Sequence, residues 1–232
     1  MELIRKNRIV AIDILKVFAV LAVLNSHMEA CYGDYKYLST GGAIGDALFF
    51  FCSGFMLFRS KVLRFDNFVK KKITRIYPTV FVIALVTCIF FNNNQNIERI
   101  LLNGGGWFVN CIMIYFIIMW FIQKFLLNRL GIVCGVLAII IIVTYYPFLN
   151  SEPGFSIYGN TYYKWIFFFV FMLQGAIIGM NIDKYKYSKK SLPIMILCIV
   201  SWYGILLTNQ KSGCFSEYIY TVSYTHLRAH ET

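Results

Sequence analysis

Seven long apolar stretches, separated by shorter polar segments, form the main pattern of this chain. They cover residues 9–28, 41–58, 76–91, 107–123, 131–149, 163–180 and 192–208. Most approach the length of about 20 residues that an α-helix needs to cross the hydrocarbon core of a bilayer. The third stretch is the shortest. The pattern predicts an all-α fold: a polytopic transmembrane helix bundle with about seven spans.

Composition supports a membrane protein. Hydrophobic residues make up 59% of the 232 residues and charged residues only 14%, whereas about a quarter of a soluble domain is charged. The first apolar stretch has no small-residue cleavage site, so we expect no cleavable signal. The seven cysteines show no C-x-x-C pair and lie mostly in apolar stretches, where cysteine behaves as a small hydrophobe. We therefore predict neither a disulfide framework nor a metal site.

The basic residues lie mostly on one side of the predicted spans. Sixteen lysines and arginines fall before the first span or after an even-numbered one, and four fall in the opposite segments. Because cytoplasmic segments are enriched in lysine and arginine, the amino terminus is predicted to be cytoplasmic. The same asymmetry explains the net charge of +11 without a nucleic-acid partner. The expected environment is a lipid bilayer.

The first apolar stretch contains three ionisable residues, Asp13, Lys16 and His27. At about 100° per residue, Lys16 and His27 share one helix face, and Asp13 lies within about 40° of it. Ionisable residues inside a membrane are costly and usually face a protein interior or a water-filled cavity, so the stripe predicts a functional site. Purely structural roles are also compatible with these positions. Asp13 can simply neutralise Lys16, Lys16 can extend to the nearer surface, and His27 can be an interfacial residue.

Five segments, in chain order, carry recognisable motifs. They are Asp13 to Lys16 followed by His27; residues 49–55, Phe-Phe-Phe-Cys-Ser-Gly-Phe; residues 72–78, Lys-Ile-Thr-Arg-Ile-Tyr-Pro; Trp107-Phe108 with Tyr115; and residues 171–179. Together they resemble the motifs of the acyltransferase-3 family of integral membrane O-acyltransferases. Lys16 and Lys72 stand where that family more often has arginine. They keep the positive charge but lose the planar fork that binds phosphate or carboxylate through two hydrogen bonds.

The resemblance implies transfer of an acyl group, most often acetyl, from acyl-coenzyme A to a hydroxyl of a cell-envelope saccharide. His27 and Lys16 are then the catalytic candidates, with His27 as general base or covalent acyl carrier and Lys16 stabilising negative charge. Lys72 and Arg75, beside Lys70 and Lys71, are the candidates for binding the donor phosphates. Asp13, Ser53, Trp107 and Tyr115 are candidate supporting residues.

Each of these assignments has a structural alternative. The basic cluster follows from the positive-inside rule alone and can contact anionic lipid headgroups. Ser53 and Gly54 can form a small-residue helix contact, which is the favoured interpretation for them. Trp107 and Tyr115 can serve as an interfacial belt and as packing.

We expect residues 1–222 to form a single membrane-embedded acyltransferase domain. The domain is expected to be incomplete at its carboxyl terminus, because the family usually has about ten helices. Residues 223–232 resemble translated sequencing adapter and are expected to be a non-native tail. We therefore do not interpret His226 and His230 as metal ligands. No bound cofactor is expected, since acyl-coenzyme A is a substrate. The expected location is multi-pass in a bacterial inner or plasma membrane, with a carbohydrate acceptor that is free or lipid-linked. The alternative function is a transporter or flippase, although no internal repeat favours it.

Overall fold

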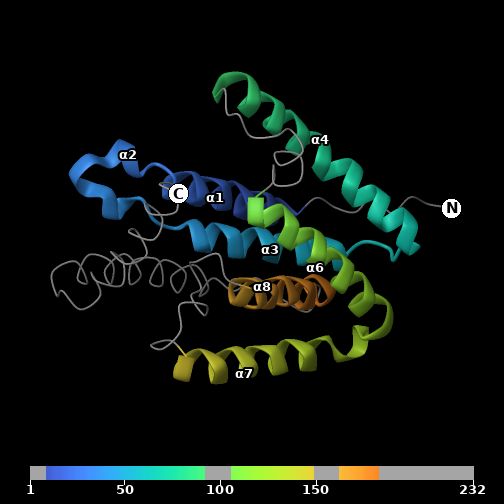
Figure 1. Cartoon of the computed structure of the whole chain (residues 1–232). Helices are drawn as coiled ribbons and strands as arrows, with labels where there is room; N and C mark the ends of the chain where they lie inside the picture. The colour runs from blue at the N-terminus through green and yellow to red at the C-terminus, as the bar shows by residue number, and fades with distance from the viewer. Residues whose placement is uncertain (1–8, 92–105, 149–161, 183–232) are drawn as a thin grey trace. The chain divides into compact units, whose positions relative to one another are not determined.

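The computed structural model describes residues 9–91, 106–148 and 162–182, and all regular structure within them is helical (Figure 1). The predicted seventh span, 192–208, lies outside the described residues. The elements are α1 (Val10–Ser26), α2 (Glu29–Tyr32), η1 (Gly33–Leu38), α3 (Gly42–Phe58), α4 (Phe65–Phe91), α6 (Gly106–Phe125), η2 (Leu127–Arg129), α7 (Leu130–Phe148) and α8 (Tyr162–Met180). The all-α prediction is thus confirmed for these residues.

Five of the predicted apolar stretches coincide with one helix each, namely α1, α3, α6, α7 and α8. Glycines with positive φ mark two of the helix starts, because Gly41 precedes α3 at φ 100° and Gly106 opens α6 at φ 57°. Glycine adopts such angles without steric cost. A long apolar run interrupted by glycine is therefore enough to place these helices.

Helix α4 differs from the prediction. The sequence pattern predicts a connecting segment up to Arg75, but residues 65–75 are helical and continue without a break into the third apolar stretch. Lysine and arginine are good helix formers, so a charged segment is no evidence against helix. Pro78 lies inside the helix. The result is one 27-residue helix with a basic first part and an apolar second part.

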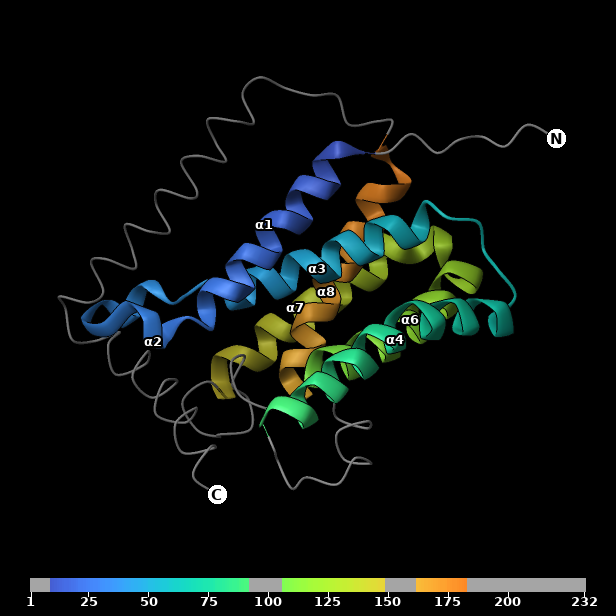
Figure 2. The same ribbon diagram turned by 90° about the horizontal axis from the view of Figure 1, so that it is seen from above.

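The described helices from α1 to α7, and α8 from Trp165 onwards, belong to one compact unit; the remaining residues form a second unit that lies almost wholly outside the described residues. Within the first unit, α1 packs along α3 (Figure 2). A Cβ atom on Gly42 would lie 2.5 Å from Ser26 Oγ, and one on Gly45 would lie 2.7 Å from the carbonyl oxygen of Ala19. The absence of side chains at these glycines lets the two backbones approach closely.

The contacts also fix the relative directions of the helices. Gly42 meets Ser26 whereas Cys52 meets Ile12, so α1 and α3 are antiparallel. Helix α6 runs parallel to α3, as the contacts Phe50–Phe108 and Leu57–Gln123 show. Helix α8 also runs parallel to α3, from the contacts Phe51–Gly175 and Phe55–Gly179. Helix α4 runs antiparallel to α6, from the contacts Phe65–Phe121 and Phe68–Phe116. This is the order of directions that the predicted alternation of spans requires.

Few of the described helices have the length and hydropathy of a membrane span taken singly. Gly106–Phe125 does, and Val10–Ser26 passes the same test together with Glu29–Tyr35, from which it is bent by 70°. Gly42–Phe58 is apolar but shorter. The seven-span topology therefore stays a prediction.

Candidate active site

Asp13 and Lys16 form an ion pair on the first turns of α1. Lys16 Nζ lies 3.8 Å from Asp13 Oδ1, and the two side chains are 39% and 36% exposed. Beside them, the Cys52 thiol of α3 lies 4.0 Å from the carbonyl oxygen of Ile12. The pair expected from the spacing is present, and it lies against the helix that carries the Phe-Phe-x-x-Ser-Gly-Phe motif.

His27 lies at the other end of α1, immediately after its last helical residue, and is exposed. Its backbone N–H donates to the carbonyl oxygen of Leu24 at 3.0 Å. Eleven residues at about 1.5 Å rise each separate it from Lys16 by about 16 Å along the helix axis. The structure therefore places Lys16 within α1 and His27 directly after it, and does not bring the two side chains together.

Asn25, two residues before His27, is the centre of a polar network that sequence reasoning missed. Its Nδ2 donates to the carbonyl oxygens of Leu38 at 2.7 Å and Thr40 at 2.9 Å. Its Oδ1 accepts the hydroxyl of Tyr32, and its backbone carbonyl accepts Ser39 Oγ at 3.0 Å. These contacts tie the end of α1 to the chain that returns towards α3.

Lys72 differs from its basic neighbours on α4. Its ammonium nitrogen lies 3.8 Å from the ring centroid of Phe116 and 5.4 Å from that of Phe68, and both rings are buried. Burial lowers the pKa of Lys72 to about 8, with smaller contributions from the positive charges of Arg75 and Lys71. Arg75, like Lys70 and Lys71, is exposed. Of the four predicted donor-binding residues, Lys72 is thus the one held in place by aromatic rings.

The connection from α3 to α4 is fastened by two side chains of α6. Gln123 is buried, and its Nε2 donates to the carbonyl oxygens of Ser60 at 3.3 Å and Leu57 at 3.5 Å. Trp120 Nε1 donates to the carbonyl oxygen of Leu63 at 2.9 Å. We call the end of the unit where α3 ends and α4 begins the basic end. It lies at the opposite end of α3 from His27, because the residue before His27, Ser26, meets Gly42 at the start of α3.

The other three candidate supporting residues, Ser53, Trp107 and Tyr115, lie where helices pack. Ser53 is half-buried and precedes Gly54, where a Cβ would overlap the carbonyl oxygen of Met172. The rings of Trp107 and Phe168 stack at 5.8 Å. The Tyr115 hydroxyl donates to the carbonyl oxygen of Trp165. These contacts agree with a packing role for Gly54, Trp107 and Tyr115.

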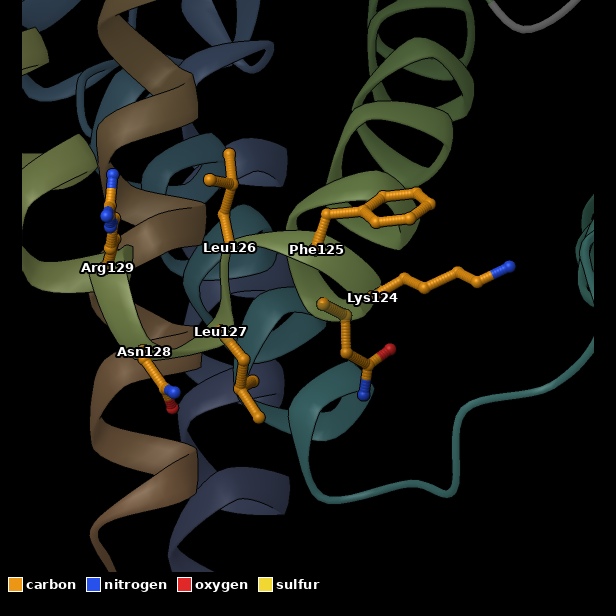
Figure 3. Close-up of a pocket in the computed structure, with 7 residues that line it drawn as sticks. Lys124, Phe125, Leu126, Leu127, Asn128 and Arg129 are labelled. Carbon is orange, nitrogen blue, oxygen red and sulfur yellow. The ribbon is translucent and has the colours of Figure 1, made fainter.

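A pocket of about 310 Å³ lies at the turn between α6 and α7 (Figure 3). Its lining is the continuous segment from Gln123 to Arg129, and it includes none of the predicted site residues. Figure 3 shows Lys124 and Arg129 on different sides of the turn. No cluster of metal-ligating side chains occurs within the residues that the structure describes.

In the residues that the structure describes, the fold is all-helical, with an exposed histidine directly after α1 and a basic cluster in the first part of α4. The chain matches the family model described as an acyltransferase domain, Acyl_transf_3, over residues 9–227. The chain therefore belongs to the acyltransferase-3 family, as the motifs predicted. No curated protein and no solved structure matches it. The match ends inside residues 223–232, whose assignment as a non-native tail stays a prediction.

Proposed function

We propose that this acyltransferase is a multi-pass membrane protein that moves an acyl group, most often acetyl, from acyl-coenzyme A to a hydroxyl of a cell-envelope saccharide. Family membership supports acyl transfer in general. The observation that carries the finer proposal is that His27 and the basic residues lie on different parts of the fold. His27 is exposed directly after Ser26, which meets Gly42 at the start of α3, whereas Lys72 and Arg75 lie in the first part of α4, which follows the end of α3.

The two ends suit the two substrates. Coenzyme A carries several phosphate charges, for which Lys72 and Arg75 offer positive partners. With the predicted topology, this basic end faces the cytoplasm, where acyl-coenzyme A is found, and His27 faces the opposite surface. The pantetheine arm would then extend past Lys16 towards His27. Because Lys16 lies about 16 Å from His27 along the helix, we assign it to stabilising negative charge on that path.

At His27 the reaction is a simple acyl transfer. The imidazole accepts the proton of the saccharide hydroxyl as its oxygen attacks the thioester carbonyl carbon. A carbon–oxygen bond forms, the carbon–sulfur bond breaks, and the proton passes to the leaving coenzyme A thiolate. Histidine suits this role because it can take up and release a proton near neutral pH.

The test uses membranes from cells that carry either the original gene or His27→Ala, supplied with acyl-labelled acetyl-coenzyme A. We expect label in envelope saccharide with the original gene and a loss of about a hundredfold or more with the variant, in the range typical of removing a general base. Asn110→Ala is a matched control, since Asn110 is an exposed polar residue near the start of α6.

Two results would count against the proposal. Equal labelling with His27→Ala would remove His27 from the chemistry. Absence of label with the original gene, while unlabelled saccharide still crosses the membrane, would favour a transporter instead.

A further inference from the structure

We propose that Asn25 is a positioning residue for the transfer reaction: its side-chain amide fixes the bend of the chain that presents His27. The inference rests on the proposed role of His27 and adds a residue to it. Asn25 touches no substrate in this account, and it acts through the backbone on either side of His27.

The bend is the first element of the argument. Helix α1 ends at Ser26, and the following helical segment, Glu29–Tyr35, is turned by 70° from it. His27 lies within this bend, where the regular hydrogen bonds of the helix have ended. Without other contacts, the last turn of a helix frays and its direction is poorly fixed.

Asn25 supplies those contacts. Its amide nitrogen has two hydrogens and donates to two carbonyl oxygens, of Leu38 and Thr40, while its amide oxygen accepts the hydroxyl of Tyr32. Carbonyl oxygens only accept, so the orientation of the amide follows from its partners. An asparagine amide provides this pairing of two donors and an acceptor within one short side chain.

The surrounding backbone is held as well. Ser39 Oγ donates to the carbonyl oxygen of Asn25, and the backbone N–H of Met28 donates to the same oxygen at 3.1 Å. Close packing of α1 on α3 brings the partners within reach, because Gly41 and Gly42 lie against Ala22 and Ser26. The network therefore spans both sides of His27, from Asn25 to Thr40.

The direction of the Asn25 side chain explains how it can hold the bend without obstructing His27. Its amide is directed to the carbonyl oxygens of Leu38 and Thr40, on the chain that returns towards α3. Asn25 is half-buried, and His27 is exposed. Anchoring thus occurs on one side and leaves the imidazole accessible on the other.

The test compares kcat and the KM for acetyl-coenzyme A, per folded molecule, in the full chain solubilised in detergent. We expect Asn25→Ala to lower kcat by about a hundredfold, the effect typical of a small misplacement of a reacting group, with the donor KM changed by less than about twofold. Asn25→Asp should lose as much, because it keeps an acceptor for Tyr32 but sets a carboxylate oxygen against the carbonyls of Leu38 and Thr40. Asn110→Ala should leave both constants unchanged.

A second variant keeps the test independent of whether Asn25→Ala folds. Tyr32→Phe combined with Ser39→Ala retains Asn25 but removes the two side-chain hydroxyls that donate to it, and it should lower kcat by roughly tenfold. An unchanged kcat per folded molecule in this double variant, or in folded Asn25→Ala, overturns the inference. If either variant gives less folded protein but its kcat per folded molecule is unchanged, Asn25 has a purely structural role.

Failure of the inference and failure of the proposed function give different results. If His27→Ala is inactive and Asn25→Ala is fully active, only the inference fails. If His27→Ala is as active as the original chain, or the original chain transfers no acyl group, both fail.

Discussion

At the scale of single residues, Lys72 experiences two opposing influences on its charge. Burial lowers its pKa to about 8, whereas the ring faces of Phe116 and Phe68 favour the ammonium form. As pH rises through about 8, the ammonium loses its proton, so we expect the KM for acyl-coenzyme A to rise. Lys72→Arg should abolish this rise, because a guanidinium stays protonated. Measuring KM from about pH 7 to about pH 9.5 checks it; the same alkaline rise in both proteins would contradict it.

The stability of the fold should respond to the same group in the opposite sense. In the unfolded chain, Lys72 regains its ordinary pKa of about 10.4, so between about pH 8 and that value the unfolded state binds more protons. The free energy of unfolding should therefore rise over this range, more so than in Lys72→Arg. Thermal unfolding at several pH values tests this; a fall in stability specific to Lys72 would contradict it. An alkaline loss of donor binding is then separable from unfolding.

Some residue contacts could be predicted from the sequence and some could not. The pairing of Asp13 with Lys16 follows from their spacing, and the placement of His27 at a helix end follows from the length of the apolar run. The network of Asn25 depends on where residues 38–40 return in space, which spacing along the chain does not contain. The same is true of Lys72, since nothing in the run Lys70 to Lys72 distinguishes the one that meets Phe116.

At the scale of elements, α3 and α8 are held together where glycine leaves room for backbone. A Cβ on Gly54 would overlap the carbonyl oxygen of Met172, whereas a Cβ on Gly135 of α7 meets nothing within 4 Å. We expect Gly54→Ala to lower the free energy of unfolding by about 1–3 kcal/mol, as overpacking does. Gly135→Ala should be neutral or stabilising by up to about 1 kcal/mol, from helix propensity. Thermal unfolding in detergent measures both; equal effects would contradict a close contact at Gly54.

A second prediction at this scale concerns Gln123. Its replacement by alanine removes the donor to the carbonyl oxygens of Leu57 and Ser60. Leaving buried polar groups unpaired costs about 1–3 kcal/mol of stability. Because this connection leads into the basic part of α4, we also expect a higher KM for acyl-coenzyme A. Lys124→Ala, at the exposed neighbouring position, is the control; a loss of the same size there would count against a specific role for Gln123.

The starts of helices could be predicted where an apolar run begins at a glycine, as in α3 and α6. The start of α4 could not be predicted in this way. Hydropathy separates charged from apolar residues, and it does not separate loop from helix. Residues 65–75 therefore have the hydropathy of a connection, while their lysines and arginine favour helix. The error lies in the boundary, since the apolar part of α4 is helical as expected.

At the scale of the whole molecule, the apolar exterior of α1 supports contact with lipid. Val10, Ile14, Val17, Leu21 and Leu24 repeat at helical spacing and are 64%, 62%, 60%, 59% and 54% exposed. If this stripe faces lipid, Val17→Asp costs about 2.5–3.5 kcal/mol of membrane insertion. Val62→Asp, at a valine that is 50% exposed in the connection before α4, should be tolerated. The fraction of each variant recovered in alkali-washed membranes measures the difference; equal recovery would contradict lipid contact.

The multi-pass membrane setting expected from composition and charge stays a prediction, whereas the directions of α1, α3, α4, α6 and α8 follow the predicted alternation. Orientation can be predicted from sequence because lysine and arginine are enriched in the cytoplasmic segments of membrane proteins. The arrangement of polar groups at the two ends needed the fold, because it depends on which helices are neighbours.

The continuity of α4 has a consequence for rotational register. Its basic and apolar parts share one helix about 40 Å long, at about 1.5 Å per residue. Inserting a single residue between Arg75 and Ile76 would turn one part by about 100° relative to the other. Lys72 could then stay on Phe116 only if the apolar part turned a different face outwards. The direction in which Lys72 projects is therefore set by the packing of the apolar part, which is predicted to lie in the membrane.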